Sequence, residues 1–154
     1  MSKGRNKKKR KTVKCYYCNN GIGKTRDHIL PRTFIDKVVS YSLNVGLFAD
    51  IPNNGYGDNV VWSCEKCNSV IKRSSIYFPT RYNLNTIFKF FTPVSIIKYS
   101  DFLWDSRRNI GGYLKDNRLK YEKEYNDWIE FIDLYSQGYF NINNIGKVLT
   151  NHGN

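Results

Sequence analysis

Two Cys-x2-Cys pairs are the part of this sequence whose residue types and spacing best fit metal chemistry. All four cysteines of the chain fall in these pairs, Cys15 with Cys18 and Cys64 with Cys67. Each pair supplies half of a tetrahedral thiolate site, and four thiolates leave no open position for substrate. In a reducing compartment this pattern indicates metal ligation, whereas an oxidising compartment would favour disulfides. We therefore expect one structural Zn2+ held by all four sulfur atoms.

Three polar side chains lie beside these pairs in the sequence. Asp27 and His28 follow the first pair, and Asn68 comes directly after the second. A carboxylate and an amide carbonyl are oxygen ligands that suit Mg2+. An imidazole, with an ordinary pKa of about 6.5, can take a proton from water at neutral pH. Closing the sulfur site would bring the segments that carry these three groups together. Asp27 and His28 are neighbours, so on a regular strand their side chains point to opposite faces, and only a twisted strand end would let both act at one point.

The segment around the first cysteine pair is predicted to be a turn followed by a strand and a helix. Residues 19–21 (Asn-Asn-Gly) predict a tight turn whose N–H groups point at thiolate sulfur. Residues 24–30 predict a short strand that ends at Pro31, which cannot continue a ladder. The apolar residues of 34–47 predict an inserted helix, and the Pro, Asn and Gly residues of 50–58 predict a loop.

The segment around the second cysteine pair is predicted to be a strand followed by a helix. Residues 60–62 are β-branched and aromatic, which indicates a short strand. Ser63 is a good N-cap for a helix over about 64–74 that carries Asn68. Together with the strand at 24–30, these elements predict a ββα unit that positions the polar residues.

The second half of the chain is predicted to be mainly helical. Aromatic and apolar residues recur at three- and four-residue steps over 121–135, which indicates an amphipathic helix that Gly138 can end. The runs 84–91 and 93–104 are also apolar and aromatic, and 12 Tyr, 9 Phe and 3 Trp are enough to build a core. The expected organisation is an α+β protein with a flexible basic arm over 1–14, a zinc-stapled core over 15–75 and a mostly helical extension over 76–154.

The net charge of +12 is concentrated at the N-terminus. Residues 1–14 carry eight Lys and Arg and no acid, so the remaining 17 basic and 13 acidic residues contribute only +4. Such an arm can bind a polyanion through counterion release, or it can be a solvated tail. It also resembles a nuclear address, which would operate only in a host with a nucleus. The expected nucleic-acid contacts of the arm are Lys7, Lys8, Lys9, Arg10 and Lys11.

Taken in order, these motifs resemble those of the HNH (ββα-metal) endonuclease family. The family combines a Cys-x2-Cys knuckle, an Asp-His step followed by Pro, an Asn before an apolar strand, and a second Cys-x2-Cys running into Asn or His. Paired Cys-x2-Cys motifs alone are common, but a pair that holds the other elements in this order is not. The matching residues span about 15–73 and are Cys15/Cys18, Asp27-His28-x-x-Pro31, Asn59-Val60-Val61 and Cys64/Cys67-Asn68.

The resemblance implies a Mg2+- or Mn2+-dependent endonuclease that hydrolyses DNA phosphodiester bonds. By this resemblance Asp27 and Asn68 would hold one divalent ion, His28 would be the general base, and Asn59 would brace the loop that orients His28. The products would be a 5′-phosphate and a 3′-hydroxyl. Each residue also has a plainer interpretation: His28 as a surface or core histidine, Asn59 as a structural residue, and Asn68 as an ordinary helix residue.

Further basic residues near the expected site are candidate phosphate contacts, or ordinary surface charges. Residues 66–100 contain six basic residues and no acid, interleaved with aromatic rings. Those rings could stack on bases, although core packing is the more common use of such residues. The candidate contacts are Arg26, Arg32, Lys66, Lys72 and Arg73.

No signal peptide and no apolar run of about 18 residues occurs, so we expect an intracellular protein without a membrane partner. It would be cytoplasmic, or nuclear if the host is eukaryotic. The abundance of Asn, Ile, Lys and Tyr is typical of an AT-rich genome and hints at a virus or mobile element. The many aromatics of the second half favour a homodimer. The alternative function is a non-catalytic zinc protein that binds nucleic acid in packaging, transcription or association with RNA.

Overall fold

The computed structural model describes residues 12–46, 59–71, 76–89 and 91–151. In this part of the chain the protein is α+β, with one small antiparallel sheet and otherwise mostly helices. The elements are β1 (Thr25–His28), α1 (Arg32–Asn44), β2 (Val60–Ser63), α2 (Glu65–Ile71), α3 (Pro93–Asp105), α4 (Arg107–Asp116), α5 (Glu122–Ser136) and α6 (Ile142–Asn151).

The sheet is a two-stranded pairing of β1 with β2. Thr25 lies opposite Ser63 and His28 lies opposite Val60, so the register runs through all four residues of each strand. The predicted strands are confirmed, although the first is shorter than 24–30 because the chain bends at Ile29 and Leu30 before reaching Pro31. The sheet therefore consists of two short antiparallel strands that are separated by 31 residues in the sequence.

Two helices accompany this sheet. The inserted helix expected between the strands is α1, and Pro31, with a φ of −53° and a non-helical ψ of 134°, is the N-cap residue that precedes it. The helix expected after Ser63 is α2, but the predicted N-cap is wrong: Ser63 ends β2, and Cys64 precedes the helix and accepts from the N–H of Cys67 through its sulfur. Helix α2 contacts β1, and Asn68 on it donates to Thr25 of the strand. Residues 72–75 of the expected helix and the expected loop over 50–58 lie outside the described residues.

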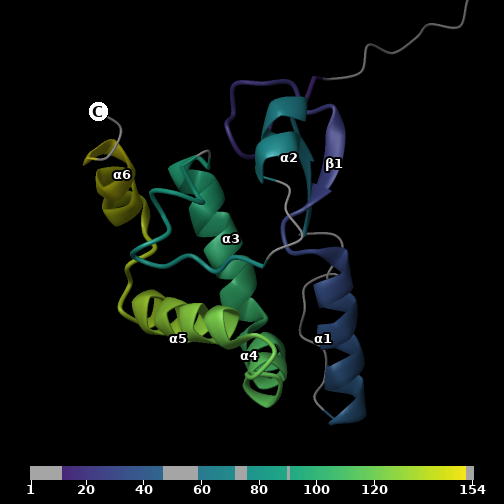
Figure 1. Cartoon of the computed structure of the whole chain (residues 1–154). Helices are drawn as coiled ribbons and strands as arrows, with labels where there is room; N and C mark the ends of the chain where they lie inside the picture. Colours follow the sequence, from purple (N-terminus) through teal and green to yellow (C-terminus); the bar gives the residue numbers. More distant parts are fainter. Residues whose placement is uncertain (1–11, 47–58, 72–75, 90, 152–154) are drawn as a thin grey trace, which may run out of the picture.

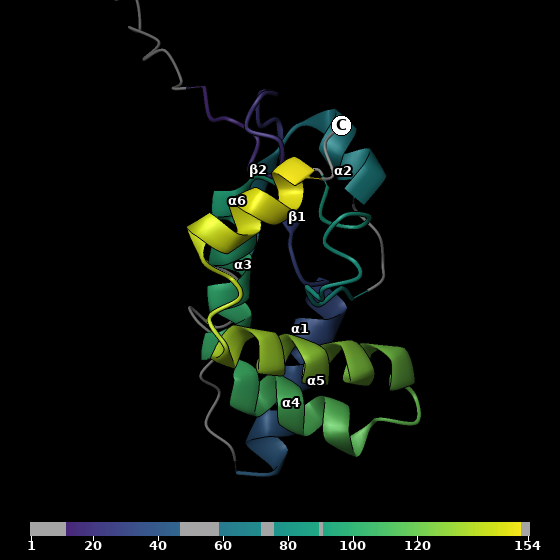
Figure 2. The same ribbon diagram turned by 90° about the vertical axis from the view of Figure 1, so that its left-hand side faces the viewer.

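The second half of the chain is helical, as predicted. The helix expected over 121–135 is α5, and Gly138 follows it with a φ of 75°. Thr92 caps α3 by accepting a hydrogen bond from the backbone N–H of Ser95 at 3.2 Å. Helix α6 packs against α3, and α4 and α5 lie side by side (Figures 1 and 2).

One hydrophobic core joins the sheet region to the helices. In Figure 1 the sheet and α2 lie together, and α1 extends downward from them. Helices α3 to α6 lie to the left of both. The ring of Tyr17, from the first cysteine pair, lies 4.7 Å from that of Phe91. The ring of Phe34 on α1 lies 5.7 Å from that of Tyr113 on α4. Among the described residues, no helix combines the length and apolar character that a bilayer crossing requires.

Candidate functional site

The first cysteine pair lies on a compact turn that precedes β1. The N–H of Cys15 donates to the carbonyl of Gly21 at 2.8 Å, and the N–H of Asn19 donates to the carbonyl of Cys15 at 2.9 Å. Asn19 has a φ of 57°, a left-handed conformation that asparagine tolerates better than most residues. The turn is closed by a bridge between Lys14 and Ile22. It holds its two thiols on the side that faces the start of α2.

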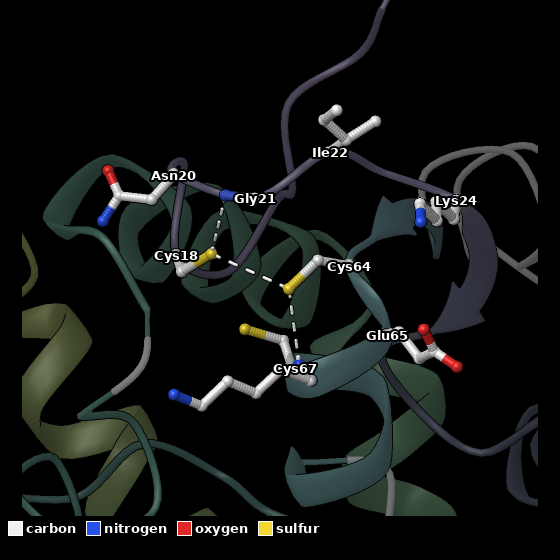
Figure 3. A pocket seen from close by; sticks show the side chains of 9 residues that line it. Cys18, Asn20, Gly21, Ile22, Lys24, Cys64, Glu65 and Cys67 are labelled. Carbon is white, nitrogen blue, oxygen red and sulfur yellow. Dashed lines mark hydrogen bonds between the residues drawn. The ribbon is translucent and has the colours of Figure 1, made fainter.

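The four cysteine sulfur atoms converge on one point. All four Sγ atoms lie within 4.8 Å of one another, and those of Cys18 and Cys64 are 3.9 Å apart. Figure 3 shows the sulfur atoms of Cys18, Cys64 and Cys67 facing a shared space. Tetrahedral zinc with Zn–S bonds of about 2.3 Å separates its sulfur atoms by about 3.8 Å. A disulfide would bring two of them to about 2.05 Å, and all four cysteines are free.

The arrangement is therefore compatible with a structural metal ion such as zinc, and the predicted convergence of the two pairs is confirmed. Backbone N–H groups support the sulfur atoms, as the sequence of the turn predicted. Gly21 donates to Cys18 Sγ and Cys67 donates to Cys64 Sγ, each at 3.4 Å. Residue 21 has to be glycine, because an added Cβ would lie 2.7 Å from the Cβ of Cys64.

The thiols of the centre differ in their acidity. Burial raises the pKa of Cys18, but hydrogen bonds from the backbone of Gly21 and Asn20 outweigh it and lower that pKa to about 6. Burial and the neighbouring thiols Cys64 and Cys18 raise the pKa of Cys67 above its ordinary range. A metal ion binds thiolates, so a cation that enters the cluster has to displace the protons that the thiols hold.

Asp27 is buried beside this centre, with 2 % of its surface exposed. The hydroxyl of Tyr17 donates to its Oδ2 at 2.8 Å. Burial, the negative charge of Asp27 and this hydrogen bond raise the pKa of Tyr17 well above its ordinary value, so the phenol stays protonated and acts as the donor. Sequence reasoning missed Tyr17; the available signal was a phenol placed inside the first Cys-x2-Cys pair.

Asn68 lies on the same side of the sheet as Asp27. Its Nδ2 donates to the hydroxyl of Thr25 at 2.8 Å, which ties α2 to the start of β1. Thr25 and Asp27 are two residues apart on the strand and share a face, whereas Arg26 between them is exposed. The carbonyl Oδ1 of Asn68 is buried and has no hydrogen-bond partner among the described residues. Thr25 was also missed, although its spacing from Asp27 on a predicted strand was a usable signal.

His28 is the last residue of β1 and is half-buried. Strand alternation assigns its side chain to the face opposite Asp27, so the sheet register alone does not bring the imidazole to Asn68. The strand ends at this residue and the chain bends at Ile29 and Leu30. The bond to Thr25 thus joins Asn68 to the strand that carries Asp27, two residues further along, and His28 lies at the end of this strand, where the sheet meets the turn into α1.

Asn59 holds the turn that follows His28. Its side chain is fully buried, accepts from the N–H of Leu30 at 2.8 Å and donates to the carbonyl of Leu30 at 2.9 Å. The N–H of Ile29 donates to the backbone carbonyl of Asn59 at 2.9 Å. Three hydrogen bonds therefore determine the path of the two residues after His28, and an asparagine is required because both an acceptor and a donor are used.

Of the candidate nucleic-acid contacts, three lie in the described part of the chain. Arg26 is exposed and its guanidinium lies 5.3 Å from the ring centre of Trp62, which is 40 % exposed. Lys66 is exposed on α2, and Arg32 forms an ion pair of 3.9 Å with Asp36 on α1. Lys7, Lys8, Lys9, Arg10, Lys11, Lys72 and Arg73 lie outside the described residues.

Most aromatic rings of the acid-free stretch are core residues. Phe78, Phe88 and Phe91 are buried, while Tyr82 is 82 % exposed. Core packing, the alternative to base stacking for these rings, is therefore confirmed for the three phenylalanines.

The comparisons with known proteins found no relative. No protein-family model matches the chain, and no curated protein and no solved structure is significantly similar to it.

Proposed function

We propose that this protein is a zinc-stabilised HNH-type endonuclease that hydrolyses DNA with the help of one Mg2+ or Mn2+ ion. The observation that carries the proposal is the contact of Asn68 with Thr25 on the face of β1 that also bears Asp27. The sulfur cluster brings these segments together, since Asn68 directly follows Cys67. The element order is β1, α1, β2, α2, so the two paired strands and the following helix that a ββα core requires are present, with α1 inserted between the strands.

The donor set supports a hard divalent cation at this face. A buried carbonyl oxygen without a donor is uncommon in native proteins and calls for a ligand or water. The Oδ1 atom of Asn68 is such an atom, and Asp27 adds a negative charge nearby on the same face. Asp27 and Asn68 would hold the ion, with water and a phosphate oxygen as the remaining ligands, as Mg2+ prefers. The ion would supply charge stabilisation for the phosphate in the transition state.

His28 is the proposed general base. Strand alternation assigns its side chain to the face opposite Asp27, but His28 is the last residue of β1 and is half-buried. A twisted strand end would let the imidazole reach a water molecule at the cation site, and Asn59 holds the turn directly after it. The imidazole would take a proton from the attacking water, and Asn59 would keep it in place. The expected products are a 5′-phosphate and a 3′-hydroxyl.

DNA is the proposed partner because the charge of the chain favours a polyanion. The net charge is +12, and eight of the basic residues lie in the first 14. Val13, at the end of this arm, accepts a hydrogen bond from the N–H of Gly23 at 2.7 Å, so the basic arm joins the folded part next to β1. Arg26 and Lys66 are exposed on the sheet and on α2.

Cleavage assays with zinc-loaded protein test the proposal. Supercoiled plasmid, linear duplex, branched DNA and single-stranded DNA are incubated with and without added Mg2+ or Mn2+, so that no chelator disturbs the sulfur site. We expect metal-dependent cleavage, lowered about 100-fold or more in Asp27→Asn, because a metal ion contributes several kcal/mol of charge stabilisation. The substitution removes the charge and leaves an oxygen that can still accept from Tyr17.

Two outcomes of this assay would contradict the proposal. Tight binding of all four substrates without cleavage would favour the non-catalytic zinc protein. Cleavage that is equal in wild type and Asp27→Asn would exclude the proposed cation site.

Asn59→Ala is expected to weaken both stability and cleavage. The change leaves the N–H and carbonyl of Leu30 without their partners, which costs about 2–6 kcal/mol at about 1–3 kcal/mol for each group. Unfolding in urea measures this loss, and cleavage per folded molecule should also fall because the turn after His28 is released.

Asn83→Ala is the matched control for Asn59→Ala. Asn83 is also buried, and its side chain likewise makes two backbone hydrogen bonds, from the N–H of Thr80 and to the carbonyl of Phe78, each 2.7 Å. It should cost similar stability and leave cleavage per folded molecule unchanged. Equal cleavage by folded Asn59→Ala and Asn83→Ala would show that Asn59 serves stability alone.

A further inference from the structure

The two tyrosines inside the first cysteine pair connect the sulfur centre to different parts of the fold. The hydroxyl of Tyr16 donates to the backbone carbonyl of Ser95 on α3 at 3.0 Å. The hydroxyl of Tyr17 donates to Oδ2 of Asp27 on β1 at 2.8 Å. Adjacent residues of one turn therefore reach in two directions, one towards the helices and one towards the proposed cation site.

The position of Tyr17 is tightly determined. Its backbone lies between two metal-ligating cysteines, and its side chain is 1 % exposed. Its ring lies 4.7 Å from the ring of Phe91 and 5.4 Å from the ring of Tyr16, in both cases measured between centres. Because packing fixes the ring of Tyr17, its hydroxyl has a fixed position, and the hydrogen bond from this hydroxyl orients the carboxylate of Asp27.

We propose that Tyr17 is a positioning residue that orients the carboxylate of Asp27 for a divalent cation. Because Tyr17 lies between Cys15 and Cys18, the orientation of this carboxylate then depends on the closed sulfur centre. The inference rests on the proposed function, because it assigns Asp27 to the cation site. A carboxylate offers about four lone-pair positions, so a hydroxyl donor on one oxygen is compatible with a cation on the other. Groups that hydrogen-bond to a metal ligand typically contribute 10- to 100-fold to metal affinity.

Tyr17→Phe tests the inference, with Tyr16→Phe as the matched control. Both changes remove one hydroxyl from the same turn, but only the first removes the bond to Asp27. Mn2+ binding to zinc-loaded protein is measured by electron paramagnetic resonance. We expect affinity about 10-fold weaker in Tyr17→Phe and unchanged in Tyr16→Phe. In cleavage, Tyr17→Phe should raise the Mn2+ concentration needed for half-maximal rate, with the rate at saturating Mn2+ close to wild type.

The absorption spectrum of Co2+-substituted protein reports separately on the four thiolates. It should be the same in wild type and both variants, since neither change removes a sulfur ligand. A weakened Mn2+ site with an unchanged thiolate spectrum is a result that general destabilisation would not produce.

A second measurement uses the wild-type protein and does not depend on how well Tyr17→Phe folds. The buried hydroxyl proton of Tyr17 is followed by NMR, with that of Tyr16 as the internal control. Addition of Mg2+ to zinc-loaded protein should shift the Tyr17 proton, because its acceptor becomes a metal ligand, and should leave the Tyr16 proton in place. Absence of any shift at Tyr17 would overturn the inference.

The outcomes separate this inference from the proposed function. Equal Mn2+ affinity of Tyr17→Phe and wild type, with binding lost in Asp27→Asn, overturns the role of Tyr17 and leaves the cation site standing. A wild-type protein that binds no Mn2+ beyond its zinc overturns the cation site and the role of Tyr17 together.

Discussion

Removal of the metal from the four-cysteine centre is expected to unfold the sheet and α2. Neither element is long enough to persist alone, because each strand has four residues and α2 has seven. Structural zinc contributes an apparent free energy of about 10–16 kcal/mol to domains of this kind, which exceeds the stability of most small domains. Loss of the turn around Cys15 would also release Tyr17 from its contact with Phe91, so the effect should extend into the core.

The measurement is thermal unfolding by circular dichroism, with zinc content determined in the same samples. A strong chelator should lower the melting temperature and abolish the near-ultraviolet signal, and added Zn2+ should restore both. Chelator mixed with excess Zn2+ is the control for non-specific effects, and Cys64→Ser should behave as the chelated protein does. A metal-free protein that keeps its melting temperature would contradict a structural role for the centre.

The loss of zinc should depend on pH in a defined direction. Protons compete with Zn2+ for the sulfur atoms, so zinc affinity falls as the pH is lowered. The pKa of Cys18 is about 6, so this thiol begins to hold its proton only near that pH. The raised pKa of Cys67 means that it must lose a proton on binding at any pH near neutrality. The zinc dissociation constant, measured against a chelator and corrected for the pH dependence of the chelator's own zinc affinity, should therefore be higher at pH 6 than at pH 8.

His28→Ala is expected to lower the rate of DNA cleavage by about 10²- to 10⁴-fold, the usual contribution of a general base. Zinc content, melting temperature and DNA affinity should stay near wild type, because His28 is half-buried at a strand end and its backbone pairing with Val60 survives the change. The measurement is single-turnover cleavage at saturating Mg2+, so that the chemical step is observed. Added imidazole should restore part of the rate.

His152→Ala is the matched control, since His152 is the other histidine of the chain. It should cleave at the wild-type rate. Metal-dependent cleavage that survives His28→Ala would remove the proposed mechanism, whatever the fate of the zinc centre.

The two cysteine half-sites and the main helices were predictable from the sequence, because both depend on local chemistry. A Cys-x2-Cys pair presents two thiolates within one turn, so its spacing alone indicates a half-site for metal. The periodic residues of α5 specify a helix with one apolar face, and Pro31 sets an upper limit for the end of β1, which stops three residues earlier at His28. Such signals act over a few residues and do not require knowledge of the fold.

The contacts that build the polar site were decided only by the tertiary structure. Tyr17 meets Asp27 across ten residues, Asn59 meets Leu30 across 29, and Asn68 meets Thr25 across 43. In each case the side-chain type allowed many partners, since a phenol, an amide or a hydroxyl can bond to almost any polar group. Closure of the sulfur cluster and pairing of the two strands select one partner for each, because burial leaves few polar groups within reach.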